Sequence, residues 1–378
     1  MRRVRNNIIF RIGENMTGFT ERAAQLSQAW ASLLQEQPKL RIREAAARLG
    51  CSELDLLHAR LHAPLNEPLQ ISTQAFGDWQ QALQALPSLG EVMALVRNQA
   101  VVHEVTGSFA ELSGSGPVRL FLGEQDQRLF LQGWQYLYLV TTDKHQSWQF
   151  FNRAGEAVMK IYQKPATNKL AWQQLQASLP VADDQWPSIS ESSLQPQPIN
   201  DLSPEQVSAL RADWAALADV HQFHGLLKKH QLNRLTALAA AGEQWAMPLP
   251  LAALDQVLTA ASEQQLPLMS FVYNPDVVQI HTAPPQRVVR MGNWLNILDP
   301  KFNLHIDESQ IASVWWVCRP SKDGVVNAIE AYDQHGQQVL QFFGARKEGR
   351  AELESWQALV GQIKQQAKSL STEECVNV

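Results

Sequence analysis

The 378-residue sequence has only three cysteines and no long apolar run. Cys51, Cys318 and Cys375 are far apart, their number is odd, and no CxxC pair occurs, so the chain fits a reducing compartment and we expect it to be cytoplasmic. The longest apolar stretches, such as VVNAIEAY, fall far short of the ~20 residues that cross a bilayer as a helix. The sequence therefore excludes a disulfide-stabilised secreted domain and predicts no membrane span.

Basic charge is also scarce. The 32 lysines and arginines are outnumbered by 37 aspartates and glutamates, and the net charge is −5. This balance argues against nucleic acid or an anionic membrane as the main partner. Signature motifs are missing as well: there is no GxGxxG after a strand, no Walker loop, no GxSxG and no HExxH. What remains is a globular composition, 45% apolar and 18% charged, in a chain long enough for two domains.

An internal repeat is present. NQAVVHEVTG (98–107) resembles NPDVVQIHTA (274–283), and FNRAGEAVMKIY (151–162) matches the apolar pattern of YDQHGQQVLQFF (332–343). Each of the latter pair is followed by a tryptophan-bearing helical pattern, LAWQQL or ESWQALV, and the early segments LLQEQPKLRIREAAARLG and LLKKHQLNRLTALAAAG are also alike. Because four segments recur in the same order, the sequence indicates a tandem duplication.

The repeat predicts the fold class and the domains. Each half begins with helical patterns and continues into alternating strands, which is typical of an α+β fold with a large antiparallel sheet and flanking helices in each half. We predict a first repeat at 16–185, a Ser/Pro/Asp-rich linker at 186–203 and a second repeat at 204–378. A helix is expected to begin after the linker, with Ser203 as N-cap. Residues 1–15 are expected to be a disordered or non-native arm before a true start at Met16.

One short stretch gathers chemistry-bearing side chains: ADVHQFHGLLKKHQLNR. On a helix His221 and His224 share a face, and Gly225 would leave space beside the imidazole of His221. A solvated polar helix face is the plain interpretation, and a zinc site is disfavoured because no matching carboxylate or cysteine accompanies the histidines. Asp219 and Gln222 could form a capping box, which would place His221 in the first helical turn. The residues alone thus indicate a duplicated α+β protein with an imidazole-and-cation cluster.

At this stretch the chain resembles the bacterial haem-utilisation proteins of the HemS/ChuS type, the hemin-degrading factors. Further similar segments extend the resemblance over nearly the whole chain: LGEVMALVRNQAVVHEVTG (89–107), RLFLQGW (128–134), MGNWLNI (291–297), SKDGVVNAIEAYDQHG (321–336) and GARKEGR (344–350). The resemblance implies a cytoplasmic haem-binding protein with two similar halves. Haem of the b type would be substrate or cargo, and an enzyme of this kind would need an external electron donor, supplied by a reductase partner or bound in a pocket without a sequence signature.

The resemblance also implies site residues. His221 of DVHQF would be the axial ligand of the haem iron, and Arg128 of RLFL would act from the opposite side of the haem with a fixed positive charge. Arg234 of LNR and Arg346 of GARKEG would hold the propionates. In one branch of the family the histidine of VVHE, here His103, binds a second haem, although a strand-borne histidine can also be a hydrogen-bonded core residue. His224 stands where relatives often carry an aromatic residue, and it is either a packing residue or an alternative ligand.

Two positions depart from the family pattern. Gly292 replaces a lysine of an MKGW-like stretch, and nearby Arg290 is a candidate substitute for the lost cation. Phe343 stands where relatives often have tyrosine, which removes a hydroxyl from the propionate end. Two functions remain open: haem degradation that releases iron, which we favour, and a non-enzymatic haem chaperone that delivers haem to a separate oxygenase.

Overall fold

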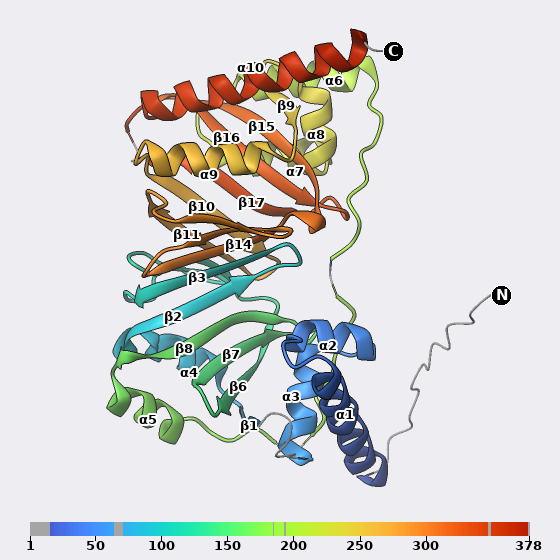
Figure 1. The fold of residues 1–378 in the computed structure, drawn as a ribbon, viewed down its shortest axis with the longest axis vertical. Coiled ribbons are helices and arrows are strands. Elements are labelled where there is room, and N and C mark those ends of the chain that lie inside the picture. Colours follow the sequence, from blue (N-terminus) through green and yellow to red (C-terminus); the bar gives the residue numbers. More distant parts are fainter. Residues whose placement is uncertain (1–15, 64–70, 184, 193, 347–348, 377–378) are drawn as a thin grey trace, which may run out of the picture. The chain divides into compact units, whose positions relative to one another are not determined.

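The protein is described by a computed structural model that covers residues 16–63, 71–183, 185–192, 194–346 and 349–376 (Figure 1). The predicted arm at 1–15 lies outside the described residues. The chain forms two compact units: unit 1 is built from residues up to 94 with 111–119 and 130–193, and unit 2 from 95–110, 120–129 and 194 onward. None of the helices in the described ranges is long and apolar enough to cross a membrane.

Unit 1 combines three N-terminal helices with an antiparallel sheet in the strand order β1-β6-β7-β8. Its elements are α1 (Met16–Glu36), α2 (Ile42–Leu49), α3 (Glu53–His62), β1 (Ile71–Phe76), α4 (Trp79–Ala85), η1 (Leu86–Leu89), β6 (Trp134–Thr142), β7 (Gln146–Asn152), β8 (Ala157–Thr167) and α5 (Lys169–Ser178). Ser52 starts α3 through a reciprocal capping box with Asp55. The core between helices and sheet contains Trp30, Leu54 and Phe151.

Two strands pass from unit 1 into unit 2, namely β2 (Gly90–Arg97) and β4 (Val118–Phe121). The remaining elements are β3 (Val101–Ser108), β5 (Asp126–Phe130), α6 (Pro204–Ala215), α7 (Gln222–His230), α8 (Arg234–Ala241), β9 (Ala246–Leu249), α9 (Ala253–Glu263), β10 (Leu268–Asn274), β11 (Val277–Ala283), β12 (Val288–Met291), β13 (Trp294–Leu298), β14 (Phe302–Asp307), η2 (Glu308–Gln310), β15 (Ile311–Ser321), β16 (Gly324–Asp333), β17 (Gln338–Gly344) and α10 (Glu354–Val376).

The main sheet of unit 2 has eight strands in the order β4-β5-β11-β10-β17-β16-β15-β9. Helices α9 and α10 lie side by side over one of its faces, where Leu258, Phe342 and Trp356 form the core (Figure 1). Helices α6, α7 and α8 pack on the other face at its β16-β15-β9 end through a core that includes Trp214 and Tyr332. The same face is left uncovered by these helices at its β11-β10 end, and this is where the candidate site is found.

In unit 2, strands of the two sequence halves pair with one another, an arrangement that we call the strand exchange. β3 from the first half pairs with β14 from the second, and β5 from the first half pairs with β11 from the second. Segments 95–110 and 120–129 therefore belong to the second compact unit. The α+β class with large antiparallel sheets is confirmed, whereas the division at 186–203 stays a prediction, because the compact units follow the strand exchange and not the repeat boundary alone.

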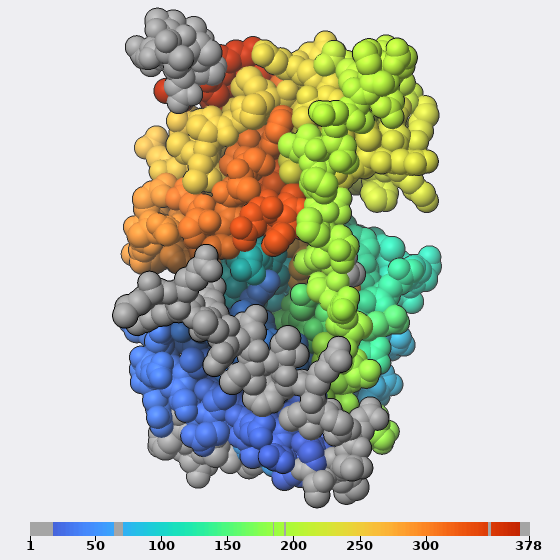
Figure 2. Space-filling view, turned by 90° about the vertical axis from the view of Figure 1, so that its right-hand side faces the viewer, coloured from blue at the N-terminus to red at the C-terminus, as the bar shows by residue number. Residues whose placement is uncertain are grey.

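The described residues of the predicted linker, 186–192 and 194–203, have no regular secondary structure and lie at the surface, where Figure 2 shows them in yellow-green. Its first part is bound to unit 1, since the indole of Trp186 donates to Asp55 at 2.7 Å. Its second part is bound to unit 2, since the backbone N–H of Gln197 donates to the carbonyl of His335 at 2.7 Å. The helix after it begins as predicted, with Ser203 and Gln206 forming a capping box.

Candidate functional site

His221 lies directly before α7 as its N-cap residue, and its side chain is exposed. Its backbone N–H donates to the Asp219 carboxylate at 2.8 Å, and the Gln222 amide oxygen accepts from the backbone N–H of Asp219 at 3.2 Å. Only half of the predicted capping box forms, because the Asp219 carboxylate reaches the residue two positions on and not three. The result is a tight turn that presents the imidazole of His221 at the start of the helix.

The neighbours of His221 on α7 leave its surroundings open. A Cβ built on Gly225 would meet no atom within 4 Å, so no packing contact with the described residues requires a glycine at this helical position. His224 is also exposed. His230, by contrast, is occupied, since its Nε2 lies 2.6 Å from the carboxylate of Asp213. Among the histidines of the stretch, His221 and His224 are thus the two whose side chains face solvent.

The phenyl ring of Phe223 lies between two guanidinium groups and holds helix α7 to the sheet. Phe223 is buried, with the guanidinium of Arg234 5.0 Å from its ring centroid and that of Arg319 4.4 Å from it. Such cation–π contacts are stronger when they are desolvated, as here. Both guanidiniums are ion-paired with Glu330, whose side chain is 0% exposed. Phe223, two residues after His221, is therefore anchored on a buried charge network.

The contacts that Glu330 makes with its partners differ in length. Arg319 and the hydroxyl of Tyr332 both donate to Glu330 in very close contacts, and the amide of Gln341 donates to it at 2.6 Å. Arg234 is farther away, with its Nη1 3.4 and 3.5 Å from the two carboxylate oxygens. Burial alone would raise the pKa of Glu330, but the two guanidiniums outweigh burial and bring that pKa below its ordinary value.

The uncovered end of the sheet presents a row of side chains that we call the aromatic face. Directly opposed residues of antiparallel strands point to the same side, so the registers of β17, β10, β11 and β5 place a set of side chains together. They are Phe343 with Met269, Gln341 with Phe271, and Tyr273 with Val278 and Arg128. Met269, Phe271, Tyr273, Phe343 and Arg128 are half-buried, and the rings of Phe271 and Phe343 meet edge to face at 5.2 Å.

Arg128 shares one rung of the sheet with Val278 and Tyr273. Its guanidinium is ion-paired with Asp126 of the same strand, and the two side chains are 34% and 28% exposed. The hydroxyl of Tyr273 donates to the amide oxygen of Gln341 at 2.5 Å, which connects the rung to Glu330. The strand exchange thus brings Arg128 of the first half into the same unit as His221 and Arg234.

Arg346 is half-buried and follows β17 by two residues, and the next two residues of the chain lie outside the described part. Burial raises the pKa of the nearby Glu352 carboxyl, and the charge of Arg346 partly opposes that shift. Phe343 belongs to the aromatic face and gives it ring surface without a hydroxyl.

His103 lies in the interior of unit 2 and is 0% exposed. Its Nδ1 is 3.1 Å from the amide oxygen of Gln279, and its ring packs edge to face on Phe302. Burial lowers the pKa of His103 to about 3 and that of His281, stacked on the same phenylalanine, to about 4. This placement matches the hydrogen-bonded core alternative. Its role as a second ligand stays a prediction.

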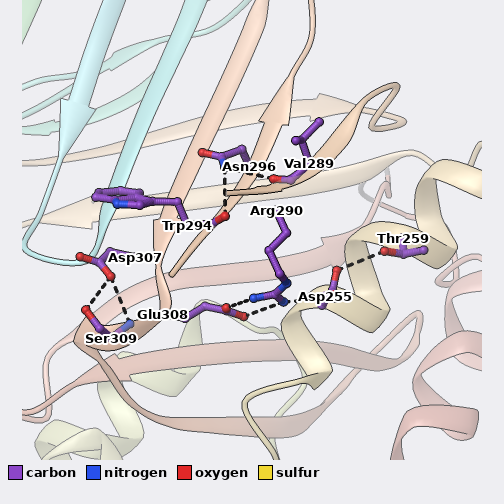
Figure 3. A network of polar contacts seen from close by, with 9 residues as sticks. All are labelled: Asp255, Thr259, Val289, Arg290, Trp294, Asn296, Asp307, Glu308 and Ser309. Atoms are coloured by element: carbon purple, nitrogen blue, oxygen red, sulfur yellow. Dashed lines mark hydrogen bonds and ion pairs between the residues drawn. The ribbon is translucent and has the colours of Figure 1, made fainter. Parts of the chain in front are cut away.

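Arg290, the candidate substitute for the cation lost at Gly292, is already paired. Figure 3 shows its guanidinium between Glu308 and Asp255, with Nη2 3.1 Å from Asp255 and 3.2 Å from Glu308. Gly292 itself occupies the β12–β13 turn with φ +60°, a conformation that favours glycine over lysine. Two carboxylates on one guanidinium leave no net positive charge there, so this arrangement gives no support to Arg290 as a replacement.

Sequence reasoning missed the partners of these residues: Arg319, Glu330, Tyr332, Gln341 and Tyr273. A signal was present, because Glu330 interrupts the apolar strand VVNAIEAY, and a charged residue in such a strand needs a buried partner. The identity of those partners was out of reach, since Arg319, Gln341 and Tyr273 come from three other strands, β15, β17 and β10.

The geometry defines a duplicated α+β protein whose second unit combines an exposed histidine, a half-buried aromatic face and guanidinium groups. The model of the haemin-degrading HemS/ChuX domain matches residues 50–179 and again 231–363. The hemin transport protein HmuS of Yersinia pestis is 32% identical over 90% of this chain and 97% of its own length. The chain therefore belongs to the HemS/ChuX family of haemin-utilisation proteins.

Two solved structures support this family assignment. Apo-PhuS, a heme-binding protein from Pseudomonas aeruginosa, is 38% identical, with a TM-score of 0.82 over 90% of this chain and 99% of its own. The heme-degrading enzyme ChuS of Escherichia coli O157:H7 is 30% identical, with a TM-score of 0.81 and the same coverage. The family match in both halves confirms the predicted duplication.

Proposed function

We propose that the protein binds haem on unit 2, with His221 as the ligand of the iron, and that it degrades imported haem in the cytoplasm. The observation that carries the proposal is the strand exchange that puts Arg128 in the unit of His221 and Arg234. The relatives named above support haem as the ligand, since one is described as a heme-binding protein and another as a heme-degrading enzyme.

The residues present suit such a ligand. Neutral imidazole is a common haem ligand, and the ring of His221 is accessible to solvent. Gly225 leaves the helix surface open for a flat macrocycle, and the aromatic face offers ring surface. Arg234 can bind a propionate in a charge-assisted contact, and we propose Arg346 as a second cation for that end. Haem brings the redox chemistry; the protein supplies the ligand, the fixed charge of Arg128 and a site partly shielded from water.

The ligand assignment is tested by haem titration of His221→Ala against His224→Ala. Both substitutions remove an exposed imidazole at the start of α7, His221 at the N-cap and His224 in the first turn. We expect His221→Ala to weaken binding and to shift the Soret band, while His224→Ala keeps the spectrum of the unaltered protein. An unchanged spectrum and affinity in His221→Ala would contradict the assignment.

Gly225→Ala gives a second test, because fold stability and haem affinity should change in opposite directions. Replacing an exposed helical glycine by alanine stabilises a protein by about 0.5–1 kcal/mol. Gly361 of α10 is a matched control, because a Cβ there also meets nothing within 4 Å. Both Gly225→Ala and Gly361→Ala should raise the free energy of unfolding, but only Gly225→Ala should weaken haem binding. Equal haem affinity in the two variants would mean that the macrocycle does not lie against α7.

Degradation and delivery are separated by incubating the haem complex with reductant in air and without oxygen, with catalase present to remove peroxide. A degrading enzyme loses the Soret band and releases iron in the aerobic sample. A chaperone keeps the band and transfers its haem to an added apo-acceptor. Persistence of the band in air with full transfer would replace the enzymatic proposal by the chaperone.

A further inference from the structure

We infer that Asp126 is a positioning residue for Arg128, a role that rests on the proposed function of this site. The two residues are two apart on β5, so their side chains lie on the same face of the sheet, about 6.5–7 Å apart along the strand. Their ion pair holds the guanidinium along the strand on the aromatic face. Asp126 thereby fixes where the positive charge lies relative to a ligand bound at His221.

On the β11 side, the strand neighbours of Arg128 offer its guanidinium no second partner. Across β11 the neighbour on the same rung is Val278, which has no polar group, and beyond it the hydroxyl proton of Tyr273 is given to Gln341. The other contact of Arg128 within the described chain is the carbonyl oxygen of Gln127 at a long 3.4 Å. Without the carboxylate, the long side chain would regain rotamer freedom that the ion pair now restricts.

The pair also leaves the cation able to act. Asp126 engages one terminal nitrogen, Nη1, while a guanidinium carries five N–H donors in a rigid fork. The remaining donors can point toward a bound group while the first stays fixed. A charge held in advance at a set position costs no reorganisation when negative charge develops near it. The carboxylate also offsets part of the positive charge, so Asp126 sets both the place and the strength of the field.

The first experiment needs no haem. Nitrogen-15 NMR of the arginine side chains in the full chain should show restricted rotation of the Arg128 guanidinium, with separate Nη signals. Asp126→Ala should abolish that separation, whereas Glu124→Gln, a loss of charge in the same segment, should preserve it, because the Glu124 carboxylate accepts from the backbone N–H of Ser108. Free rotation of Arg128 in the unaltered protein would overturn the inference whatever the fate of the proposed function.

The second experiment uses the carbon monoxide complex of the reduced, hemin-loaded protein. The C–O stretching frequency reports the field at the bound molecule, and Arg128→Ala should shift it. Asp126→Ala should broaden the band and move it toward the frequency of Arg128→Ala, and should change nothing further in the Arg128→Ala background. An equal shift by Asp126→Ala in both backgrounds would show that Asp126 acts directly and not through Arg128. Absence of any hemin complex would defeat the proposed function alone, since the NMR result stands by itself.

Discussion

Glu330→Gln is the substitution for which the structure gives the largest expected effect. Glu330 is 0% exposed and neutralises Arg319, whose side chain is 4% exposed. Removing one partner of a buried ion pair leaves the other charge uncompensated and costs about 3–5 kcal/mol. Glutamine keeps the shape and one acceptor oxygen, so we expect about 3 kcal/mol, a large part of the 5–15 kcal/mol that stabilises a typical domain.

The matched control is Glu308→Gln. Glu308 is 11% exposed, but its partner Arg290 is 44% exposed, and a pair that reaches solvent contributes about 0–1 kcal/mol. The assay is urea unfolding followed by hydrogen exchange in peptides of α7, β16 and β17, which reports unit 2 by itself in a protein of two units. Losses within 1 kcal/mol of each other for the two variants would refute the reasoning.

The pH dependence of stability provides a second test of the Glu330 ion pairs. The folded-state pKa of Glu330 lies below the ordinary value of 4.5. Its ion pairs therefore stabilise the fold at pH values above the unfolded-state pKa, and this stability is lost as the pH falls through the folded-state pKa. The difference in unfolding free energy between the unaltered protein and Glu330→Gln should be constant near neutral pH and shrink below about pH 4.5. A difference that grows with acid would have the wrong sign.

Three further predictions concern the linker, the buried His103 and the two arginines Arg128 and Arg234. Limited proteolysis should cut first within 186–203, and early cuts inside 204–234 with a resistant linker would count against the domain division. Burial lowers the pKa of His103 to about 3, so folding favours the neutral imidazole. The free energy of unfolding should therefore fall as the pH drops from the unfolded-state pKa of 6.5 toward the folded-state pKa of about 3. His103→Gln should flatten that slope in acid titrations of unfolding. Arg128→Ala should slow the loss of the Soret band and barely change haem affinity, whereas Arg234→Ala should cost about 1.5–3 kcal/mol of affinity; equal losses of affinity in titrations of both would make Arg128 a structural anchor.

The sequence sufficed for the features that depend on local pattern. Alternating strands, the helix start at Ser203 and the duplication all follow from residues close together in the chain or from direct comparison of segments. The turn before α7 shows the limit of such reasoning, because Asp219 and Gln222 had the right spacing for a capping box and still formed only half of it. The Asp219 carboxylate instead accepts a hydrogen bond from the backbone N–H of His221.

The strand exchange could not be predicted, and the reason is physical. β3 and β11 carry nearly the same apolar pattern, VVHEVTG and VVQIHTA, so each would bury its side chains equally well beside a strand of either half. Pattern decides which face of a strand is buried but not which of two similar strands lies next to it. The resemblance to a family supplied Arg128 as a candidate, and the pairing of β5 with β11 shows how a first-half residue enters the second unit.

The two carboxylates of the site suggest why its two arginines should have different roles. Glu330 is engaged by Arg319, Tyr332 and Gln341 in close contacts, so its contact with Arg234 at 3.4 Å is the weakest of the set. An incoming propionate would compete with the loosest of the contacts that Glu330 makes, because three other donors already engage that carboxylate more closely. Arg128 is held by a carboxylate of its own, that of Asp126, on the same half-buried strand. A carboxylate approaching Arg128 would compete with Asp126, whereas a neutral or weakly charged group would not. The propionate end of haem should therefore turn toward Arg234, with the less charged centre of the macrocycle left to Arg128.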